Sequence, residues 1–208
     1  MGYVLNMSMI LPTHTDMSFD AFLLAYGEIE GRYEMYDGEI FAMAGGSPSH
    51  GHVSSNALVA LQKRARPRGC VTYGSDVYIR PDDDNKSAML PDAFVRCGPP
   101  PPKEQRYITD PVVIVEVLSP STMSFDRGAK LQRYFNFTSL QHVIILYQDE
   151  YRAEMWTRPP EGAKATDVDG NLLWSHTVAN GLTSSLKIDA LEANILLDEF
   201  YDGVALAA

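Results

Sequence analysis

An almost wholly apolar run, Pro111–Val117, places the tightest constraint on how this chain can fold. Its sequence is Pro-Val-Val-Ile-Val-Glu-Val, with four β-branched residues in succession before Glu116. A continuous β-branched run is typical of a strand that is covered on both faces, as at the centre of a sheet. The run therefore predicts a sheet with a layer of structure on each side.

Glu116 interrupts this run, and its side chain points to the same face as those of Val112 and Ile114. An ionised carboxylate buried there costs several kcal/mol unless a cation or a metal ion compensates it. The position of Glu116 therefore predicts a positively charged partner.

The composition indicates a single globular domain. Of the 208 residues 45% are apolar, which is enough for one core. The longest unbroken apolar run, Ala21–Tyr26, is far shorter than the roughly 18 residues of a membrane helix. No Lys or Arg precedes Arg32, so the sequence lacks the positive flank of a secretory signal. We therefore expect a cytoplasmic protein. We expect an irregular tail over residues 1–17 and one domain over residues 18–204.

The formal net charge of −10 disfavours a protein that coats nucleic acid without specificity, because a negative surface repels phosphates. An enzyme of nucleic acids is still compatible with this charge, since a bound divalent cation can reverse the local sign. The two cysteines, Cys70 and Cys97, are too few for a disulfide scaffold and are expected to be buried free thiols.

Hydrophobic periodicity and turn residues predict the order of the elements. The expected helices span residues 18–28, 50–65 and 124–137, with a last helical turn at 196–201. The expected strands span residues 71–80, 90–95, 112–117, 142–147, 152–157, 172–177 and 186–188, besides a hairpin at 32–43 that turns at Asp37-Gly38. This order favours an α/β (α+β) fold, a central mixed sheet flanked by helices, with an N-terminal helix and hairpin.

A second acid, Asp92, stands at the start of the predicted strand 90–95. Acids on adjacent strands can converge into an oxygen site for Mg²⁺ or Mn²⁺. Lys130, on the helix after Glu116, could reach that site, although its spacing taken alone favours a surface ion pair with Asp126. Asp92, Glu116 and Lys130 together suggest metal-assisted phosphodiester hydrolysis.

Weaker candidates surround these three residues. His50 begins a predicted helix and could contact water or phosphate, or simply bond to the backbone. Asp76 could join the acidic cluster, with an exposed turn as the alternative. Glu34 and Glu39 flank the predicted hairpin and are expected to make cross-strand or solvent contacts.

Several segments together resemble the Uma-two family, a bacterial group of restriction-endonuclease-like proteins. They are Arg32-Tyr33-Glu34, Asp37-Gly38-Glu39-Ile40, Ser47-Pro48-Ser49-His50, Gly74-Ser75-Asp76, Pro91-Asp92, Val115-Glu116-Val117-Leu118-Ser119-Pro120-Ser121-Thr122, and Asp126 with Lys130 and Tyr134. The resemblance covers nearly the whole chain. It implies a restriction-endonuclease-like core of the PD-(D/E)xK superfamily, in which Asp92, Glu116 and the carbonyl of Val117 bind the metal ion.

The sequence departs from the superfamily pattern of Glu, any residue, Lys, because Leu118 stands where the lysine is expected. The resemblance implies that Lys130, from the following helix, replaces it. Two functions follow as alternatives. One is a Mg²⁺- or Mn²⁺-dependent endonuclease acting on DNA. The other is a catalytically silent nuclease-like domain that binds nucleic acid or protein. A homodimer is also expected, since the last predicted strands are apolar enough to associate.

Overall fold

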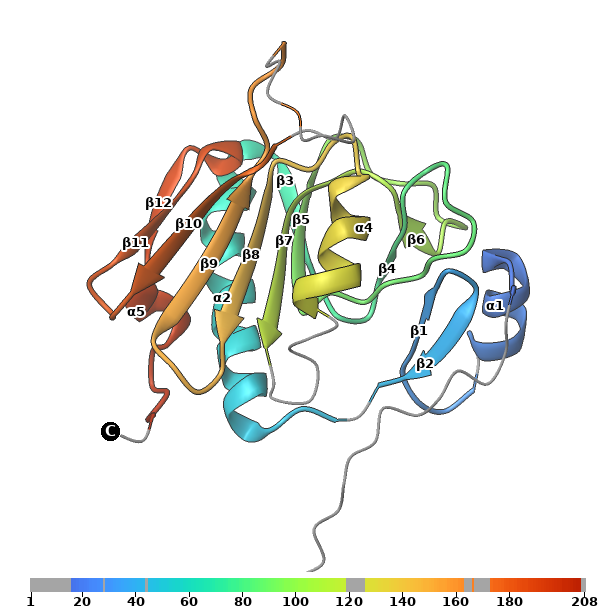
Figure 1. The fold of residues 1–208 in the computed structure, drawn as a ribbon, viewed down its shortest axis with the longest axis horizontal. Coiled ribbons are helices and arrows are strands. Elements are labelled where there is room, and N and C mark those ends of the chain that lie inside the picture. The colour runs from blue at the N-terminus through green and yellow to red at the C-terminus, as the bar shows by residue number, and fades with distance from the viewer. Residues whose placement is uncertain are drawn as a thin grey trace, which may run out of the picture.

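A six-stranded mixed sheet forms the centre of the molecule (Figure 1). The computed structural model describes residues 16–27, 29–43, 45–118, 126–162, 166 and 173–206, with the backbone alone at 126 and 127. In sheet order the strands are β10 (Ser175–Asn180), β9 (Arg152–Thr157), β8 (His142–Tyr147), β7 (Pro111–Leu118), β5 (Ala93–Cys97) and β3 (Cys70–Gly74). β7 and β8 run parallel, and the other neighbours are antiparallel. The predicted α/β class with a central mixed sheet is confirmed.

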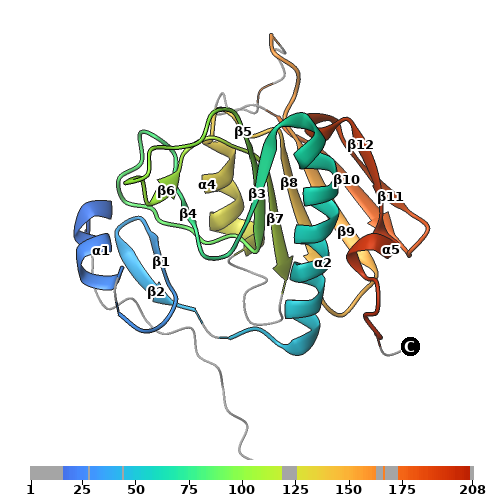
Figure 2. The ribbon, with the colours of Figure 1, turned by 180° about the vertical axis from the view of Figure 1, so that it is seen from behind.

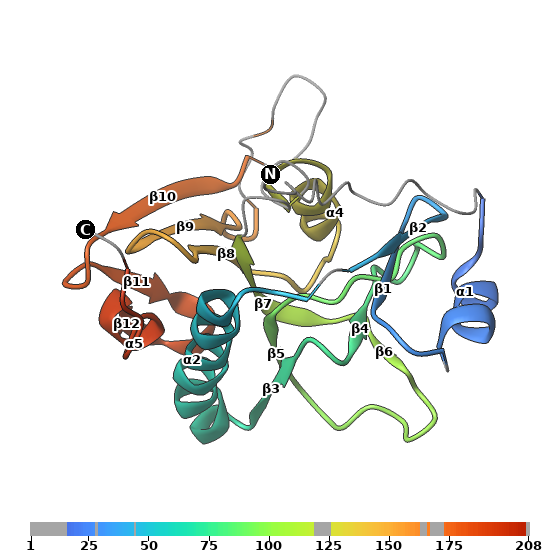
Figure 3. The same ribbon diagram turned by 90° about the horizontal axis from the view of Figure 1, so that it is seen from below.

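The predicted central strand is β7, which lies between β5 and β8 inside the sheet. Helix α2 (Pro48–Ala65) covers one face of the sheet and helix α4 (Leu131–Phe135) the other (Figures 2 and 3). Val113 and Val115 belong to the core beneath α2, and Ile114 belongs to the core beneath α4. The β-branched run therefore reflects burial on both faces.

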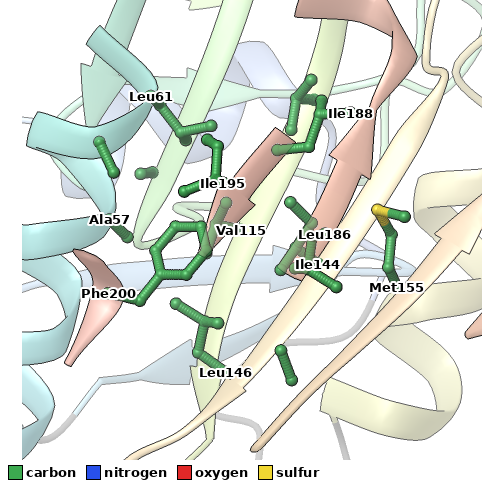
Figure 4. Packing of buried hydrophobic residues seen from close by; sticks show 14 of the residues in the cluster. Ala57, Leu61, Val115, Ile144, Leu146, Met155, Leu186, Ile188, Ile195 and Phe200 are labelled. Atoms are coloured by element: carbon green, nitrogen blue, oxygen red, sulfur yellow. The ribbon is translucent and has the colours of Figure 1, made fainter. Parts of the chain in front are cut away.

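The larger core lies between α2, the sheet and the C-terminal elements. Those elements are the hairpin of β11 (Ser185–Ile188) and β12 (Ala193–Leu196), followed by α5 (Leu197–Phe200). Figure 4 shows Phe200 beside Ala57 of α2, with Leu186 and Ile195 of the hairpin packed in the same cluster. The sequence predicted the helical turn and the first of these strands, but not β12.

The predicted N-terminal helix and hairpin are present and lie beside the sheet, next to β4 (Tyr78–Ile79) and β6 (Tyr107–Ile108) (Figure 1). They comprise α1 (Phe19–Tyr26), β1 (Tyr33–Tyr36) and β2 (Glu39–Ala42). The hairpin turns as predicted, because Asp37 and Gly38 take the positive φ values of 51° and 81° that such a tight turn requires. Met35 and Ala88 exchange two backbone hydrogen bonds of 2.8 and 2.9 Å, which tie β1 to the segment before β5.

Two predicted elements are broken in the structure. The predicted strand 71–80 divides into β3 and β4, and β4 leaves the sheet to pair with β6. The predicted helix 124–137 contains a π-type turn, Asp126–Lys130, and a shorter helix α4. Gly128 has φ −104° and ψ −105°, which are not helical angles, and glycine tolerates them because it has no Cβ atom.

Some predictions concern parts of the chain outside the described residues. These are most of the tail 1–17, the start of the helix 124–137, residue 172 and the segment from Ser119 to Thr122. Within the described ranges, no helix is both long and apolar enough to cross a membrane.

The expectation of free thiols is wrong, because Cys70 and Cys97 form a disulfide. The antiparallel register of β3 and β5 places the two residues directly opposite each other, with Cα atoms 4.2 Å apart. The count of cysteines could not reveal this pairing, since the pairing depends on which residues of the two strands face each other.

Removal of this disulfide is expected to lower the free energy of unfolding by about 3.5 kcal/mol, the loop entropy released when a bond across 27 residues is lost. Urea unfolding of wild type with and without reductant, and of a Cys70→Ser/Cys97→Ser variant, measures the effect. Reductant should leave the double variant unchanged. An unaltered wild-type midpoint in reductant contradicts the prediction.

His142 on β8 makes stability depend on pH. Its side chain is 1% exposed, its Nδ1 atom lies 3.1 Å from Thr157 Oγ1, and its Nε2 atom accepts a 3.3 Å hydrogen bond from the amide of Ala190. Burial lowers the pKa of His142 below 6.5. The neutral ring is therefore the form that the fold accommodates.

Below pH 6.5 the unfolded His142 binds a proton more readily than the folded one. The contribution of neutral His142 to the free energy of unfolding is complete above pH 6.5 and is lost as the pH falls through the folded pKa. The free energy of unfolding changes by at most about 1.4 kcal/mol per pH unit. Urea titrations at several pH values, for wild type and His142→Gln, isolate this slope as the difference between the two curves. Parallel curves would show that His142 does not cause the pH dependence of stability.

Candidate active site

The sheet register brings Asp92 and Glu116 together. β5 and β7 pair with Ala93 opposite Val115, and Asp92 directly precedes β5 and accepts a hydrogen bond from the Val117 amide of β7. Glu116 is the neighbour of Val117 on β7. The two acids that the sequence predicts as metal ligands therefore lie next to each other at one end of the central strand.

Asp92 is held by the backbone of β7 and by α2. Its Oδ2 atom accepts a 2.8 Å hydrogen bond from the amide of Val117 and lies 3.4 Å from His50 Nε2. Burial acts to raise the pKa of Asp92, but the hydrogen bond and charge of His50, the Val117 amide and the charge of Lys130 together lower it. Asp92 is therefore ionised at neutral pH.

His50 reaches Asp92 from the first turn of helix α2, which begins at Pro48. Ser47 caps the helix by accepting a 3.0 Å hydrogen bond from the His50 amide, and Ser49 donates a 2.7 Å hydrogen bond to the Gln148 carbonyl after β8. The hydrogen bond with Asp92 raises the pKa of His50 above 6.5, against the opposing effect of burial. His50 also has a backbone hydrogen bond with Val117, which contributes to the raised pKa, so the expected backbone contact is present together with the contact to Asp92, and a role with water or phosphate stays a prediction.

Lys130 lies at the centre of a buried ion cluster. Its Nζ atom is 2.8 Å from Glu116 Oε1 and 3.0 Å from Glu34 Oε1, and its side chain is only 3% exposed. The Tyr134 hydroxyl donates a further hydrogen bond to Glu116 Oε1. Burial and the Glu116 carboxylate raise the pKa of Tyr134 well above 10, so the hydroxyl keeps the proton that it donates. The positive partner that Glu116 requires is Lys130.

The backbone turn before α4 carries Lys130 inward. Tyr36 of the hairpin donates a 2.9 Å hydrogen bond to the carbonyl of Ala129, next to Lys130. Arg133 of α4 forms ion pairs with Asp37 of the hairpin and with Asp84. These contacts fix the start of α4 against β1.

For Glu34 the expectation of cross-strand or solvent contacts is wrong. Its side chain lies in the interior rather than in solvent, and its Oε1 atom accepts a 2.6 Å hydrogen bond from the amide of Leu90 besides the contact with Lys130. That amide is available because the pairing of Met35 with Ala88 brings the two segments together. No local pattern in the hairpin distinguishes Glu34 from Glu39, so burial could not be predicted from spacing.

The donor set is compatible with a hard divalent cation. Three carboxylates, those of Glu34, Asp92 and Glu116, face one ammonium group, which leaves a charge of −2 when His50 is neutral. Among the described residues no three His, Cys, Asp or Glu side chains are arranged to enclose a metal ion. Mg²⁺ typically uses only one or two carboxylates and retains several waters, a number that Asp92 and Glu116 would supply.

Two other positions from the sequence lie outside this cluster. Asp76 is exposed in the turn between β3 and β4 and lines a neighbouring cavity. Leu118, at the position of the superfamily lysine, is buried with Ile145 and Tyr147 in a small apolar cluster. The structure therefore places an ammonium group near Glu116 only through Lys130, as far as the described residues show.

Comparison with known proteins shows the family and the fold of this chain. Two uncharacterised proteins of Synechocystis sp. are similar in sequence: slr1290 is 30% identical over 63% of this chain and 68% of its own length, and sll1609 is 26% identical over 72% and 85%. A crystal structure described as "a putative nuclease belonging to DUF820" from Anabaena variabilis has the same fold, with a TM-score of 0.68 and 14% identity over 89% of this chain and 98% of that protein. The model of the Uma2 (Uma-two) family, described as "Putative restriction endonuclease", matches residues 19–189. The resemblance seen in the sequence is thereby confirmed, and the chain belongs to the Uma2 family.

Proposed function

We propose that this protein is a divalent-metal-dependent endonuclease that hydrolyses phosphodiester bonds of DNA. The observation that carries the proposal is the convergence of Asp92, Glu116 and Lys130 from three separate segments, two acids and one amine, at one end of β7. Family membership supports the same activity.

The metal ion is proposed to be Mg²⁺ or Mn²⁺, bound by the carboxylates of Asp92 and Glu116 and the carbonyl of Val117. When bound, it would polarise the phosphate and lower the pKa of a coordinated water molecule. Lys130 fixes the Glu116 carboxylate and contributes a positive charge that favours the negatively charged transition state. Glu34 holds Lys130 in place, and His50 holds a proton beside Asp92.

A catalytically silent domain that binds nucleic acid or protein is the second candidate. Leu118 at the usual lysine position and the full engagement of Lys130 with two carboxylates favour it. In this alternative the ion cluster only stabilises the fold. A homodimer remains a prediction under both candidates.

Calorimetric titration with Mn²⁺ or Mg²⁺ separates the two candidates. The enzyme should bind the cation, and Asp92→Asn and Glu116→Gln should each abolish the heat of binding. Asp83→Asn is the matched control, because it removes a carboxylate from an exposed turn. Wild type that binds no cation, or binds it equally well without Asp92, supports the silent domain.

A further inference from the structure

A cavity of about 420 Å³ lies beside the candidate active site. It opens between the end of α1, the segment before β1, the turn before β4 and the loop before β6, elements that group together at one side of the sheet (Figures 1 and 2). Its volume falls within the ~300–1,000 Å³ typical of small-molecule pockets. The cavity therefore has room for about one nucleotide unit.

Two backbone segments connect this cavity to the ion cluster. Leu90 lines the cavity, and its amide donates the hydrogen bond to Glu34. Arg32 lines it two residues before Glu34, and Asp92 follows Leu90 by two residues. Two residues of extended chain span about 7 Å, equivalent to about two steps of ~3.4 Å along a DNA strand. A strand with one phosphate at Asp92 and Glu116 can therefore place a phosphate one or two steps away in the cavity.

The charged side chains of the cavity favour an anion. Arg32 and Arg106 are exposed at its wall, where they donate hydrogen bonds of 3.3 and 3.2 Å to the backbone carbonyls of Ser75 and Gly27. Among the described residues of the lining, Asp76 is the one acid. The described side chains therefore carry two positive charges and one negative, whereas the whole chain carries −10. Guanidinium groups suit phosphate because they donate two parallel hydrogen bonds.

We propose that this cavity binds the backbone phosphates of a DNA strand next to the bond that is cleaved, with Arg32 and Arg106 as the phosphate-binding residues. The proposal rests on the proposed function for the position of the cleaved bond. The binding itself requires neither metal ion nor cleavage, so it can be measured separately.

Fluorescence anisotropy of a short fluorescein-labelled single-stranded oligonucleotide, in EDTA, tests the proposal. Arg32→Gln and Arg106→Gln should each weaken binding about 5- to 10-fold and reduce the slope of log K against log salt by about 0.7, the value for one phosphate contact on a single strand. Lys103→Gln is the matched control, since it removes an exposed positive charge from the same loop but outside the cavity lining. Circular dichroism checks that each variant is folded.

Asp76→Asn gives a test of opposite sign. Removal of this carboxylate should tighten oligonucleotide binding about 2- to 5-fold, because it removes a repulsive charge from the phosphate site. Arg32→Lys should retain part of the affinity that Arg32→Gln loses. The proposal is overturned if Lys103→Gln weakens binding as much as the two arginine variants do, or if Asp76→Asn weakens it.

The two proposals fail in different ways. If Asp92-dependent cleavage occurs but the arginine variants bind DNA as wild type does, the cavity proposal is wrong and the endonuclease proposal stands. If no divalent cation supports cleavage but the arginine variants lose affinity and salt dependence, phosphate binding stands and the endonuclease proposal fails.

Discussion

Cleavage of supercoiled plasmid and single-stranded DNA in Mn²⁺ is expected to fall about 100- to 1,000-fold in Asp92→Asn. A bound metal ion contributes several kcal/mol to stabilisation of the transition state, and each 1.36 kcal/mol corresponds to a factor of ten in rate. Asparagine keeps the shape of the side chain and can still accept the hydrogen bond from the Val117 amide. The fall in cleavage rate should therefore reflect loss of the Asp92 charge rather than unfolding of the protein. Gel electrophoresis of time courses measures the rates.

Glu116→Gln should cause a loss of similar size, whereas Asp83→Asn in the exposed turn should cleave as wild type does. The pair of variants also detects contamination. Equal cleavage by wild type, Asp92→Asn and Glu116→Gln would place the activity elsewhere in the chain or in another protein of the preparation.

Replacement of Lys130 by methionine is expected to lower the free energy of unfolding by about 3–5 kcal/mol, since it leaves buried carboxylates without their cation. Lys130 is the cation shared by Glu34 and Glu116, and all three side chains are at least 90% buried. A loss of this size is a large part of the ~5–15 kcal/mol that stabilises a typical domain. Urea unfolding followed by circular dichroism measures the effect.

Removal of the two carboxylates together with the ammonium group should restore most of this stability. The triple variant Glu34→Gln/Glu116→Gln/Lys130→Met removes the ammonium group together with the two carboxylates that form ion pairs with it. Among single variants, Glu116→Gln should be tolerated better than Glu116→Lys, which would face Lys130 with a second cation. If the unfolding midpoints of Lys130→Met and wild type agree closely, the cluster contributes little to stability.

The sequence predicted the parts of the fold and site that depend on local pattern. The β-branched run before Glu116 predicted the central strand, and Asp37-Gly38 predicted the hairpin turn. Asp92 and Glu116 could be paired because each stands on a predicted strand and adjacent strands align their ends. The contact with Lys130 required the resemblance as well, since spacing alone favoured a surface position.

The remaining features depend on how distant segments align. Glu34 is buried because β1 pairs with the segment before β5, and Cys70 meets Cys97 because of the register of β3 with β5. Neither pairing leaves a signal in the residues themselves. The break of the long predicted helix at Gly128 was also missed, because a single glycine is tolerated in many helices.

Because Glu34 lies on β1 of the N-terminal hairpin, the protein cannot be shortened past this hairpin without loss of a carboxylate beside Lys130. A fragment that begins at α2 retains all six strands of the sheet, yet it lacks the hairpin that supplies one of the two carboxylates beside Lys130. It also loses the Tyr36 contact with the turn that carries this lysine. The smallest unit able to hold the Lys130 amine in place therefore includes the hairpin of β1 and β2.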